Sequence, residues 1–302
     1  MKKSKAVVLL LRLPFLVVTL GSVFVGTAFA WWYARQFDLV LFLLTMIGAC
    51  FLHLACNVAN DYFDYKSGTD AANVYAVAPF SGGSRMVLEG FVIPGEALAI
   101  SIILAILGSA IGLYLNAVSA GNVILLIGVA ALLLVFGYNG PPLKLVNLGI
   151  GEIGIFLAWG PLMVLGAYYV QAQSFSSFWP LIAALPPGIL TTLVLVINEF
   201  ADAEADRSAR RKTWVILFGF KKTVYIYLAL ALGCYIVILA GVLFGGWPLW
   251  SLLVMLTLPL SFMAFRIALK NIENWTAFLP AVKTTILINF VFLVILSMSF
   301  VV

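Results

Sequence analysis

Charged residues are scarce in this sequence: they make up 10% of its 302 residues, whereas hydrophobic residues make up 64%. An ordinary soluble domain carries about a quarter charged residues and roughly half apolar ones. A chain this apolar could not cover its own surface in water. The shortage of charge therefore excludes a typical soluble fold and predicts a membrane protein.

Histidine and cysteine are also rare, with one His and three Cys in the chain. No two cysteines have the spacing of metal ligands, and Cys50, Cys56 and Cys234 all lie in apolar runs. We therefore expect neither a cysteine metal site nor a disulfide framework, and we assign the cysteines to packing. His53 lies in an apolar run one turn before Asn57, so we expect a hydrogen-bonded interior residue rather than a ligand or base.

Long apolar runs are abundant instead. About 20 helical residues cross the roughly 30 Å hydrocarbon layer, and a helix satisfies its own backbone polar groups there. Weak alternation and few charges argue against a membrane barrel. We predict an all-α polytopic membrane protein whose residues 1–302 form one transmembrane domain. The predicted spans are Leu13–Arg35, Leu39–Asn60, Ile93–Leu115, Gly121–Tyr138, Ile150–Gln171, Phe178–Phe200, Thr223–Phe244, Leu249–Ile267 and Phe278–Val301.

Lysine and arginine in the loops predict the orientation of these spans in the cell membrane. If the amino terminus is cytoplasmic, fifteen of the 17 basic residues fall on the cytoplasmic side, Arg35 falls on the other, and Lys283 lies near the start of the last span. The opposite face carries the aromatic belt typical of a membrane interface. The net charge of +5 is therefore a topological signal. We expect the lipid bilayer as a partner and no nucleic acid.

Acidic residues gather after the second and the sixth predicted spans, at what this topology makes the cytoplasmic mouth. Residues four apart stack on one face of a helix, so Asn60 and Asp64 form part of one row, and Asn198, Asp202 and Asp206 form another. Acidic groups near a membrane are costly unless paired or bound to cations, which favours a functional site. We call Asn60, Asp61, Asp64 and Asp70 the first acidic row, and Asn198, Asp202 and Asp206 the second.

Oxygen-only rows of this kind suit Mg²⁺, which binds one or two carboxylates together with substrate phosphates. Two facing rows could hold metal ions around a diphosphate. The alternative is a pair of solvated helix ends whose acids pair with Lys66 or Arg207. Two rows on the same side, each led by an intramembrane Asn, argue against that alternative because such groups are costly to bury.

Basic residues follow the second row directly, in the run Arg207, Arg210, Arg211 and Lys212. Arg and Lys both bind phosphate oxygens, so we expect one or two of these four at a diphosphate and the rest to serve topology. After the first row, the loop Ser81-Gly82-Gly83-Ser84-Arg85 is flexible enough to bring backbone amides near an anion.

At these rows the sequence resembles the UbiA superfamily of intramembrane aromatic prenyltransferases. That family carries an NDxxDxxxD motif after the second helix and a DxxxD motif after the sixth; here Asn60-Asp61-x-x-Asp64 precedes Asp70, and the second motif reads Asp202-x-x-x-Asp206. The branch resembled most is that of the 1,4-dihydroxy-2-naphthoate prenyltransferases, which make menaquinone precursors. The segments that carry this are Ser67–Asp70, Gly82–Gly83, Glu89–Gly90, Tyr138–Leu145 and Gly149–Tyr169.

The resemblance implies nine spans around a central cavity, with the acidic rows at its cytoplasmic end. It implies Mg²⁺ as cofactor, bound by Asn60, Asp61, Asp64, Asp70, Asn198, Asp202 and Asp206, of which the aspartates Asp61, Asp64, Asp202 and Asp206 are catalytic. It implies a polyprenyl diphosphate donor, such as geranylgeranyl diphosphate, and an aromatic acceptor. The substrate-binding residues expected are Arg85, Lys144, Arg207, Lys212, Tyr138 and Asn139. Glu152 could orient the acceptor, assist proton loss or make a structural hydrogen bond.

Other functions stay open at this point. Within the superfamily the acceptor could instead be 4-hydroxybenzoate, homogentisate, haem, chlorophyllide or a glyceryl phosphate. A transporter would also use intramembrane acids, but transporter sites usually lie near the membrane midplane, whereas these rows lie at one mouth. An inactive quinone-binding relative is expected to lack at least one Asp of the rows, and none is missing.

Overall fold

A computed structural model describes residues 1–73 and 82–302, and within them it contains helices and no strand, which confirms the predicted all-α class. Of the predicted phosphate loop, Ser81 lies outside the described residues. The helices are α1 (Lys3–Leu11), η1 (Leu13–Phe15), α2 (Leu16–Ala34), α3 (Leu39–Ser67), α4 (Thr69–Ala72), α5 (Pro94–Val118), α6 (Val123–Gly137), α7 (Leu145–Leu148), α8 (Gly151–Leu157), η2 (Ala158–Leu162), α9 (Met163–Ala172), α10 (Trp179–Ser208), α11 (Trp214–Phe218), α12 (Phe220–Phe244), η3 (Leu249–Thr257), α13 (Leu258–Lys270) and α14 (Trp275–Val301).

The long helices make this a multi-pass membrane protein. In the described chain, 8 helical segments are long and apolar enough to cross a membrane. The predicted span Gly121–Tyr138 corresponds to α6, which has 15 residues and therefore rises about 22 Å, less than the roughly 30 Å hydrocarbon layer. The helices that run furthest beyond their predicted ends are α3, which continues to Ser67, and α10, which continues to Ser208. The acidic rows therefore lie on rigid helix rather than in loops.

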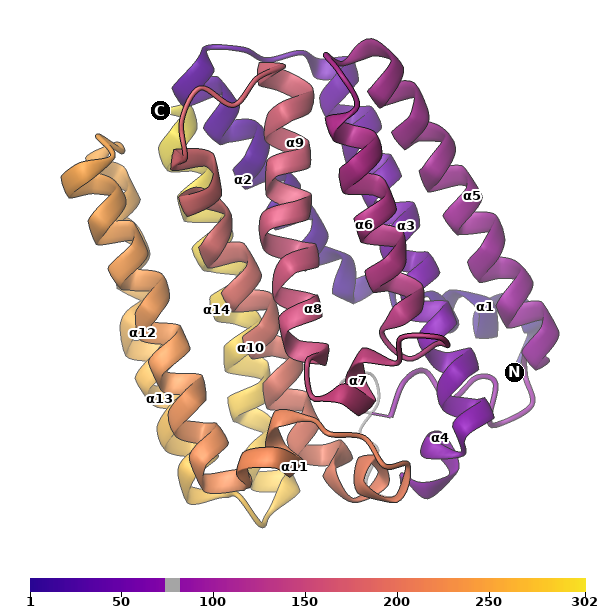
Figure 1. The fold of residues 1–302 in the computed structure, drawn as a ribbon. Coiled ribbons are helices and arrows are strands. Elements are labelled where there is room, and N and C mark those ends of the chain that lie inside the picture. The colour runs from indigo at the N-terminus through magenta and orange to yellow at the C-terminus, as the bar shows by residue number, and fades with distance from the viewer. Residues whose placement is uncertain (74–81) are drawn as a thin grey trace.

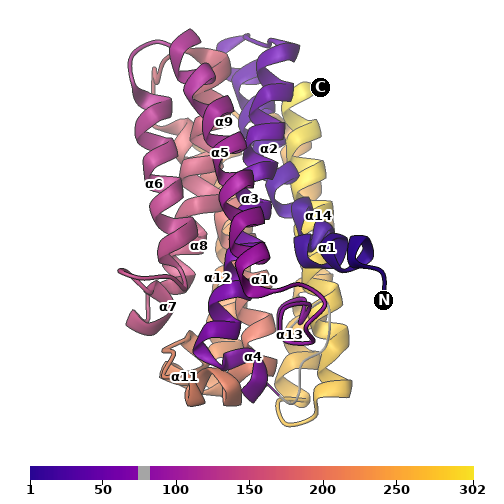
Figure 2. The same ribbon diagram turned by 90° about the vertical axis from the view of Figure 1, so that its right-hand side faces the viewer.

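The long helices stand side by side, and the short helices α4, α7 and α11 gather at one end of the bundle (Figures 1 and 2). The carboxyl terminus lies at the opposite end, while α1 lies across the bundle (Figure 2). Helix α3 ends at Gly68, whose φ of 78° is a left-handed conformation that glycine adopts without strain. This turn folds α4 back beneath α3 and so brings Asp70 to the mouth of the bundle.

The segment formed by α8, η2 and α9 crosses α10 at very close range. A Cβ on Gly160 would lie 2.9 Å from the Cα of Gly188, so only glycine fits at this crossing. Small residues of this kind allow helix backbones to approach closely inside a membrane. A π-helical turn that contains Pro161 lies at the same place. The crossing fixes α8 against α10, and hence Glu152 relative to the second acidic row.

Candidate active site

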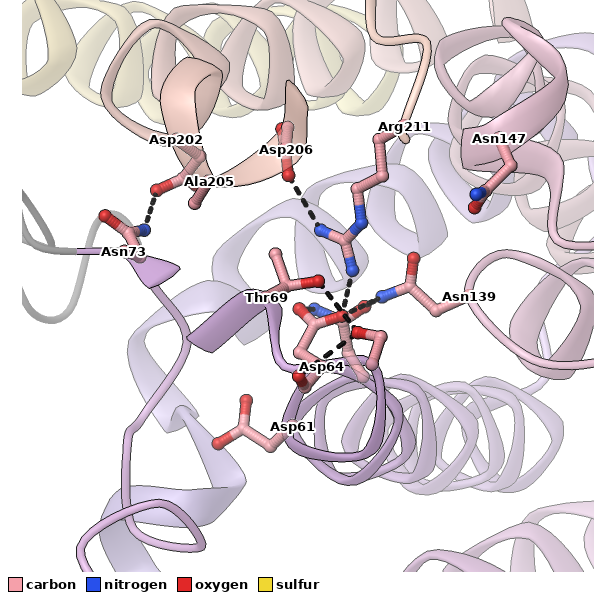
Figure 3. Close-up of polar contacts among 12 residues, drawn as sticks. Asp61, Asp64, Thr69, Asn73, Asn139, Asn147, Asp202, Ala205, Asp206 and Arg211 are labelled. Carbon is pink, nitrogen blue, oxygen red and sulfur yellow. Dashed lines mark hydrogen bonds and ion pairs between the residues drawn. The ribbon is translucent and has the colours of Figure 1, made fainter. Parts of the chain in front are cut away.

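The two acidic rows face each other at the end of the bundle where α3 and α10 finish (Figure 3). Between them lies a cavity of about 110 Å³. It combines members of both rows with two arginines, glycine backbone and, toward the interior, apolar side chains. The residues that line it are Arg12, Asn60, Asp64, Thr69, Asp70, Asn73, Gly82, Gly83, Tyr138, Val146, Leu195, Asn198, Glu199, Asp202, Asp206, Arg211 and Thr213.

Arg211 joins the two rows. One guanidinium nitrogen, Nη2, forms an ion pair with Oδ1 of Asp64, and the other, Nη1, donates to Oδ1 of Asp206 at 3.0 Å (Figure 3). Asn139 also donates to Oδ1 of Asp64, at 2.9 Å, and contacts the side-chain oxygen of Asn60. Burial lowers the pKa of Arg211, but the carboxylates of Asp64 and Asp206 more than offset this and raise it above its usual value. The arginine is therefore a permanent cation between the rows.

The other two motif aspartates are held by loop residues. Asp61 accepts hydrogen bonds from the backbone N–H of Ser84, at 3.0 Å, and from its hydroxyl. Asp202 accepts from Nδ2 of Asn73 at 2.6 Å, and Arg85 donates to the backbone carbonyl of Asn73 at 3.0 Å. These contacts tie the loop segments on either side of residues 74–81 to both acidic rows.

Gly83 brings its backbone directly against the first row. Its φ is +64°, and a Cβ at this position would lie 2.7 Å from Oδ1 of Asp61. Both facts require glycine here. The amide of Ser84 in this loop donates to the carboxylate of Asp61. That the loop also binds an anionic ligand stays a prediction.

Within the part of the chain that the structure describes, several buried oxygens of the rows have no hydrogen-bond donor. These are Oδ1 of Asp61, Oδ2 of Asp70 and the side-chain oxygen of Asn198. Burial, and after it the neighbouring Asp64 and Asp61 carboxylates, raise the pKa of the Asp70 carboxyl to about 8. Free oxygen ligands from carboxylates and an amide fit a hard cation such as Mg²⁺. In the described chain, no three acidic, His or Cys side chains converge on one point, so a cation here would also need ligands from its substrate.

The predicted substrate-binding cations are distributed unevenly. Arg85 is half-buried against Asn73, whereas Lys144, Arg207 and Lys212 are exposed and do not line the cavity. The two arginines that do line it are Arg211 and Arg12, whose guanidinium lies 3.9 Å from Asp61. Neither was predicted as a site residue. The only sequence signal was the position of Arg211 in the basic run after the second row.

Two buried glutamates lie at the inner side of the cavity. Glu152 accepts a hydrogen bond from the backbone N–H of Trp214 at 2.5 Å. A structural hydrogen bond of this kind is one of the three roles expected for Glu152. Glu199 lines the cavity, is 4% exposed and pairs its carboxyl group with that of Glu152; among the described residues no N–H or hydroxyl group donates to it. His53 is hydrogen-bonded to the hydroxyl of Thr19 at 2.6 Å, which confirms the interior role expected for it.

An apolar cavity of about 140 Å³ lies deeper in the bundle, between α2, α3, α5, α6 and the α8–α9 segment. Its wall includes Thr45, His53, Trp159 and five helical glycines of these segments: Gly48, Gly108, Gly112, Gly128 and Gly166. A cavity of about 10 Å³ is lined by both Tyr138 and Trp159. Tyr138 also lines the acidic cavity and Trp159 the apolar one. The small cavity therefore adjoins both of the larger ones.

Comparison with known proteins identifies the family to which this site belongs. The profile of the UbiA prenyltransferase family matches residues 19–294. The 2-carboxy-1,4-naphthoquinone phytyltransferase of Synechocystis is 30% identical over 256 residues, which cover 84% of this chain and 79% of the relative. The 1,4-dihydroxy-2-naphthoate octaprenyltransferase of Bacillus subtilis is 27% identical over 284 residues, covering 94% of this chain and 88% of the relative.

The fold is likewise shared with solved structures. A UbiA homolog from Archaeoglobus fulgidus bound to GPP and Mg²⁺ superposes with a TM-score of 0.63 at 14% identity, covering 98% of this chain and 99% of that chain. At this identity the likeness concerns the fold alone. It agrees with the helical arrangement described above.

Proposed function

We propose that this chain, which belongs to the UbiA prenyltransferase family, transfers a polyprenyl group from an isoprenoid diphosphate to 1,4-dihydroxy-2-naphthoate. Prenyl transfer follows from the family and from its prenyltransferase relatives; the acceptor is the proposed part. Both relatives described above are named for naphthalene rings that carry a carboxyl group. The observation that carries the proposal is the facing of the two acidic rows across one cavity.

The mouth cavity is the proposed diphosphate site. The rows offer Asn60, Asp61, Asp64, Asp70, Asn198, Asp202 and Asp206 as ligands for Mg²⁺, and the A. fulgidus homolog bound to GPP and Mg²⁺ supports this assignment. Bound Mg²⁺ neutralises the negative charge that develops on the departing diphosphate. Asn139 keeps the carboxylate of Asp64 turned toward the cavity by its 2.9 Å hydrogen bond.

Arg211 and Arg12 are the proposed diphosphate-binding cations, because both guanidinium groups line the cavity. An Arg fork donates two parallel hydrogen bonds to phosphate oxygens. Arg211 now makes these bonds to Asp64 and Asp206, so we propose that it exchanges carboxylate oxygens for diphosphate oxygens when the donor binds. The exposed Lys144, Arg207 and Lys212 would then act from the rim, by attracting the anionic donor at longer range.

The prenyl group is proposed to run from the mouth, past Tyr138, into the apolar cavity. Breaking the bond between the prenyl carbon and the diphosphate oxygen leaves an allylic cation, which must be kept from water. The face of the Tyr138 ring can stabilise such a cation. The carbon–carbon bond to the acceptor ring would form beside this residue, where the acidic and apolar cavities adjoin. The attacked ring carbon would then lose its proton to the released diphosphate, and the ring would regain its aromaticity.

The depth of the path fits a long prenyl chain. The 15 residue steps of α3 from Asn60 to Thr45 rise about 22 Å at roughly 1.5 Å per step. An extended carbon chain advances roughly 1.2 Å per bond, as an extended peptide backbone does, so the main chain of a geranylgeranyl group spans about 19 Å. Thr45 lines the far end of the apolar cavity. A geranylgeranyl group is therefore the donor that we propose, with the mouth on the cytoplasmic side.

Acceptor competition tests this proposal. Membranes that contain the protein are given geranylgeranyl diphosphate with equal amounts of 1,4-dihydroxy-2-naphthoate, 4-hydroxybenzoate, homogentisate and glyceryl phosphate, and membranes with the Asp202→Asn variant serve as the blank. We expect the prenylated naphthalene product to dominate and to be missing from the blank. Preferential prenylation of another acceptor would retain the enzyme and overturn the proposed branch.

A further inference from the structure

His53 has one ring nitrogen that the protein leaves without a partner. The residue is 6% exposed and borders the apolar cavity, and its Nδ1 is hydrogen-bonded to the Thr19 hydroxyl at 2.6 Å. Among the described residues no group pairs with the other ring nitrogen, Nε2, and protein atoms do not cover it completely. The open space beside His53 is the apolar cavity, so Nε2 faces that cavity.

The contacts of Thr19 determine which nitrogen of His53 carries the hydrogen. The indole N–H of Trp159 donates to the Thr19 hydroxyl oxygen at 3.0 Å, and an indole nitrogen can only donate. In the described chain the hydroxyl hydrogen of Thr19 has no acceptor other than Nδ1 of His53, so it is donated there. An imidazole that accepts at Nδ1 is neutral and carries its single N–H at Nε2. Nε2 is therefore a hydrogen-bond donor that faces the cavity.

The cavity wall offers this donor no acceptor. The other two side chains of the wall that carry N–H or O–H groups are already paired, because Thr45 donates to the carbonyl of Leu41 at 2.7 Å and Trp159 donates to Thr19. A buried water molecule needs about two to four polar partners, and beside Nε2 it would find one. A prenyl chain has no acceptor atom. The free donor therefore indicates a ligand that brings an acceptor oxygen into an apolar site.

We propose that the apolar cavity binds an uncharged isoprenoid quinone, with one ring carbonyl accepting a hydrogen bond from Nε2 of His53. Charge excludes an aromatic acid from this position, because its carboxylate would be costly to bury beside one neutral donor. A carbonyl oxygen on an apolar ring carries no such cost. The flat ring can pack against Trp159, whose indole stands edge to face with the His53 imidazole at 5.0 Å between ring centroids.

The dimensions of the cavity fit a ring at His53 with a prenyl tail directed toward Thr45. The eight residue steps of α3 between these residues rise about 12 Å, and a geranyl chain spans about 10 Å at roughly 1.2 Å per bond. The same space is the proposed path of the donor's prenyl group, and in this respect the inference rests on the proposed function. Quinone and geranylgeranyl diphosphate then exclude each other, so a quinone that accumulates in the membrane inhibits prenyl transfer.

Paired ligands and paired variants test the site by binding alone. One ligand is 2-methyl-3-geranyl-1,4-naphthoquinone, whose quinone ring has no free position for prenylation, and the other is 2-methyl-3-geranylnaphthalene, which lacks both carbonyls. A neutral hydrogen bond corresponds to roughly 3- to 10-fold in affinity. We expect His53→Phe, which keeps an aromatic ring, to weaken quinone binding by about that factor and to leave hydrocarbon binding unchanged. Thr45→Val, the matched control in the same cavity wall, should change neither.

Equal quinone affinity for His53→Phe and the wild type would overturn the proposal. Quinone binding in bilayers of ether-linked lipids only would overturn it as well, because the hydrogen bond would then belong to the ester carbonyl of a lipid. If His53→Phe does not fold, the infrared spectrum of the quinone bound to the wild type decides. One of its two carbonyl bands must move to lower frequency, and two unshifted bands would contradict the hydrogen bond.

Inhibition kinetics separate this inference from the proposed function. We expect the quinone to raise KM for geranylgeranyl diphosphate and to leave kcat unchanged. Binding that depends on His53 but does not compete with the donor would support the quinone site and contradict the proposed path of the prenyl group. A wild type that binds the quinone through His53 and prenylates no aromatic acceptor would likewise support the site and overturn the proposed function.

Discussion

Replacing Arg211 with methionine removes the guanidinium that joins the two acidic rows and keeps a side chain of similar length. The ion pairs it makes are nearly buried: the exposed fractions are 12% for the Arg211 side chain, 8% for Asp64 and 3% for Asp206. Without Mg²⁺, the variant leaves both carboxylates facing each other with no cation between them. Asp64 keeps its hydrogen bond from Asn139, so the missing guanidinium destabilises the Asp206 carboxylate most.

Removing one partner of a buried ion pair costs about 3–5 kcal/mol. At this chain length 1 kcal/mol shifts Tm by roughly 2 °C, so we expect Tm in chelator to fall by roughly 6–10 °C. Mg²⁺ supplies the missing positive charge, and saturation at 100 times Kd adds about 2.7 kcal/mol to the stability. In the wild type a cation must first displace Arg211 from the same oxygens. Mg²⁺ should therefore raise Tm more in the variant than in the wild type.

Thermal unfolding of the detergent-solubilised protein, in chelator and in Mg²⁺, measures both effects. Arg207→Met is the matched control because Arg207 is an exposed cation of the same basic run, and its loss should change the stability by less than about 0.5 kcal/mol. Equal Tm values for Arg211→Met and the wild type in chelator would refute the bridging role. A variant that Mg²⁺ does not stabilise would refute the placement of the metal between the rows.

Three further results are expected. Asp64→Ala and Asp202→Ala should abolish turnover and leave the protein inserted and folded, so retained activity in either one would contradict the assignment of the rows. Gly112→Leu fills the apolar cavity at a position where a Cβ meets nothing within 4 Å. This variant should lose activity with geranylgeranyl diphosphate but keep activity with geranyl diphosphate. Gly233→Leu, equally unobstructed but outside this cavity, should keep both activities. Burial raises the pKa of Asp70 to about 8, so its carboxyl group is protonated at lower pH and Mg²⁺ must displace that proton. The apparent affinity for Mg²⁺ should therefore rise by up to about tenfold from pH 6.5 to 7.5 and level off above pH 8. Asp70→Asn should show a shallower rise, and an unchanged slope would exclude Asp70 as a ligand.

The acidic rows could be predicted because two simple regularities locate them. Residues four apart share a helical face, and α3 and α10 stay helical through Asp64 and Asp206. The second and sixth spans also end on the same side of any membrane they cross. Spacing and span number together therefore place Asp64 and Asp206 at one mouth, where the structure brings them together on Arg211.

The choice among the basic residues could not be predicted in the same way. Helix α10 ends at Ser208, so helical periodicity no longer says where Arg210, Arg211 or Lys212 point. Arg12 adopts a left-handed conformation, with φ of 52°, which separates α1 from the first span and turns its side chain toward Asp61. In the sequence this residue is indistinguishable from a topological charge before an apolar run.

Glu199, which also lines the cavity, was not predicted for a related reason. It lies three positions before Asp202, on the same side of α10, but spacing alone does not show which residue of another helix it will meet. Its partner Glu152 lies 47 positions earlier in the chain and is brought to it by the glycine crossing of α8–η2 with α10. Contacts between segments so far apart depend on packing that no local pattern specifies.

Metal-dependent turnover by the purified protein tests the central claim most directly. Wild type and Asp202→Asn are given geranylgeranyl diphosphate and 1,4-dihydroxy-2-naphthoate, with Mg²⁺ or with chelator, and both the released diphosphate and the prenylated product are measured. We expect equal amounts of diphosphate and product from the wild type in Mg²⁺, and neither from the wild type in chelator nor from Asp202→Asn. Product formation in chelator, or by Asp202→Asn at the wild-type rate, would contradict a reaction in which the two acidic rows bind the metal and the diphosphate.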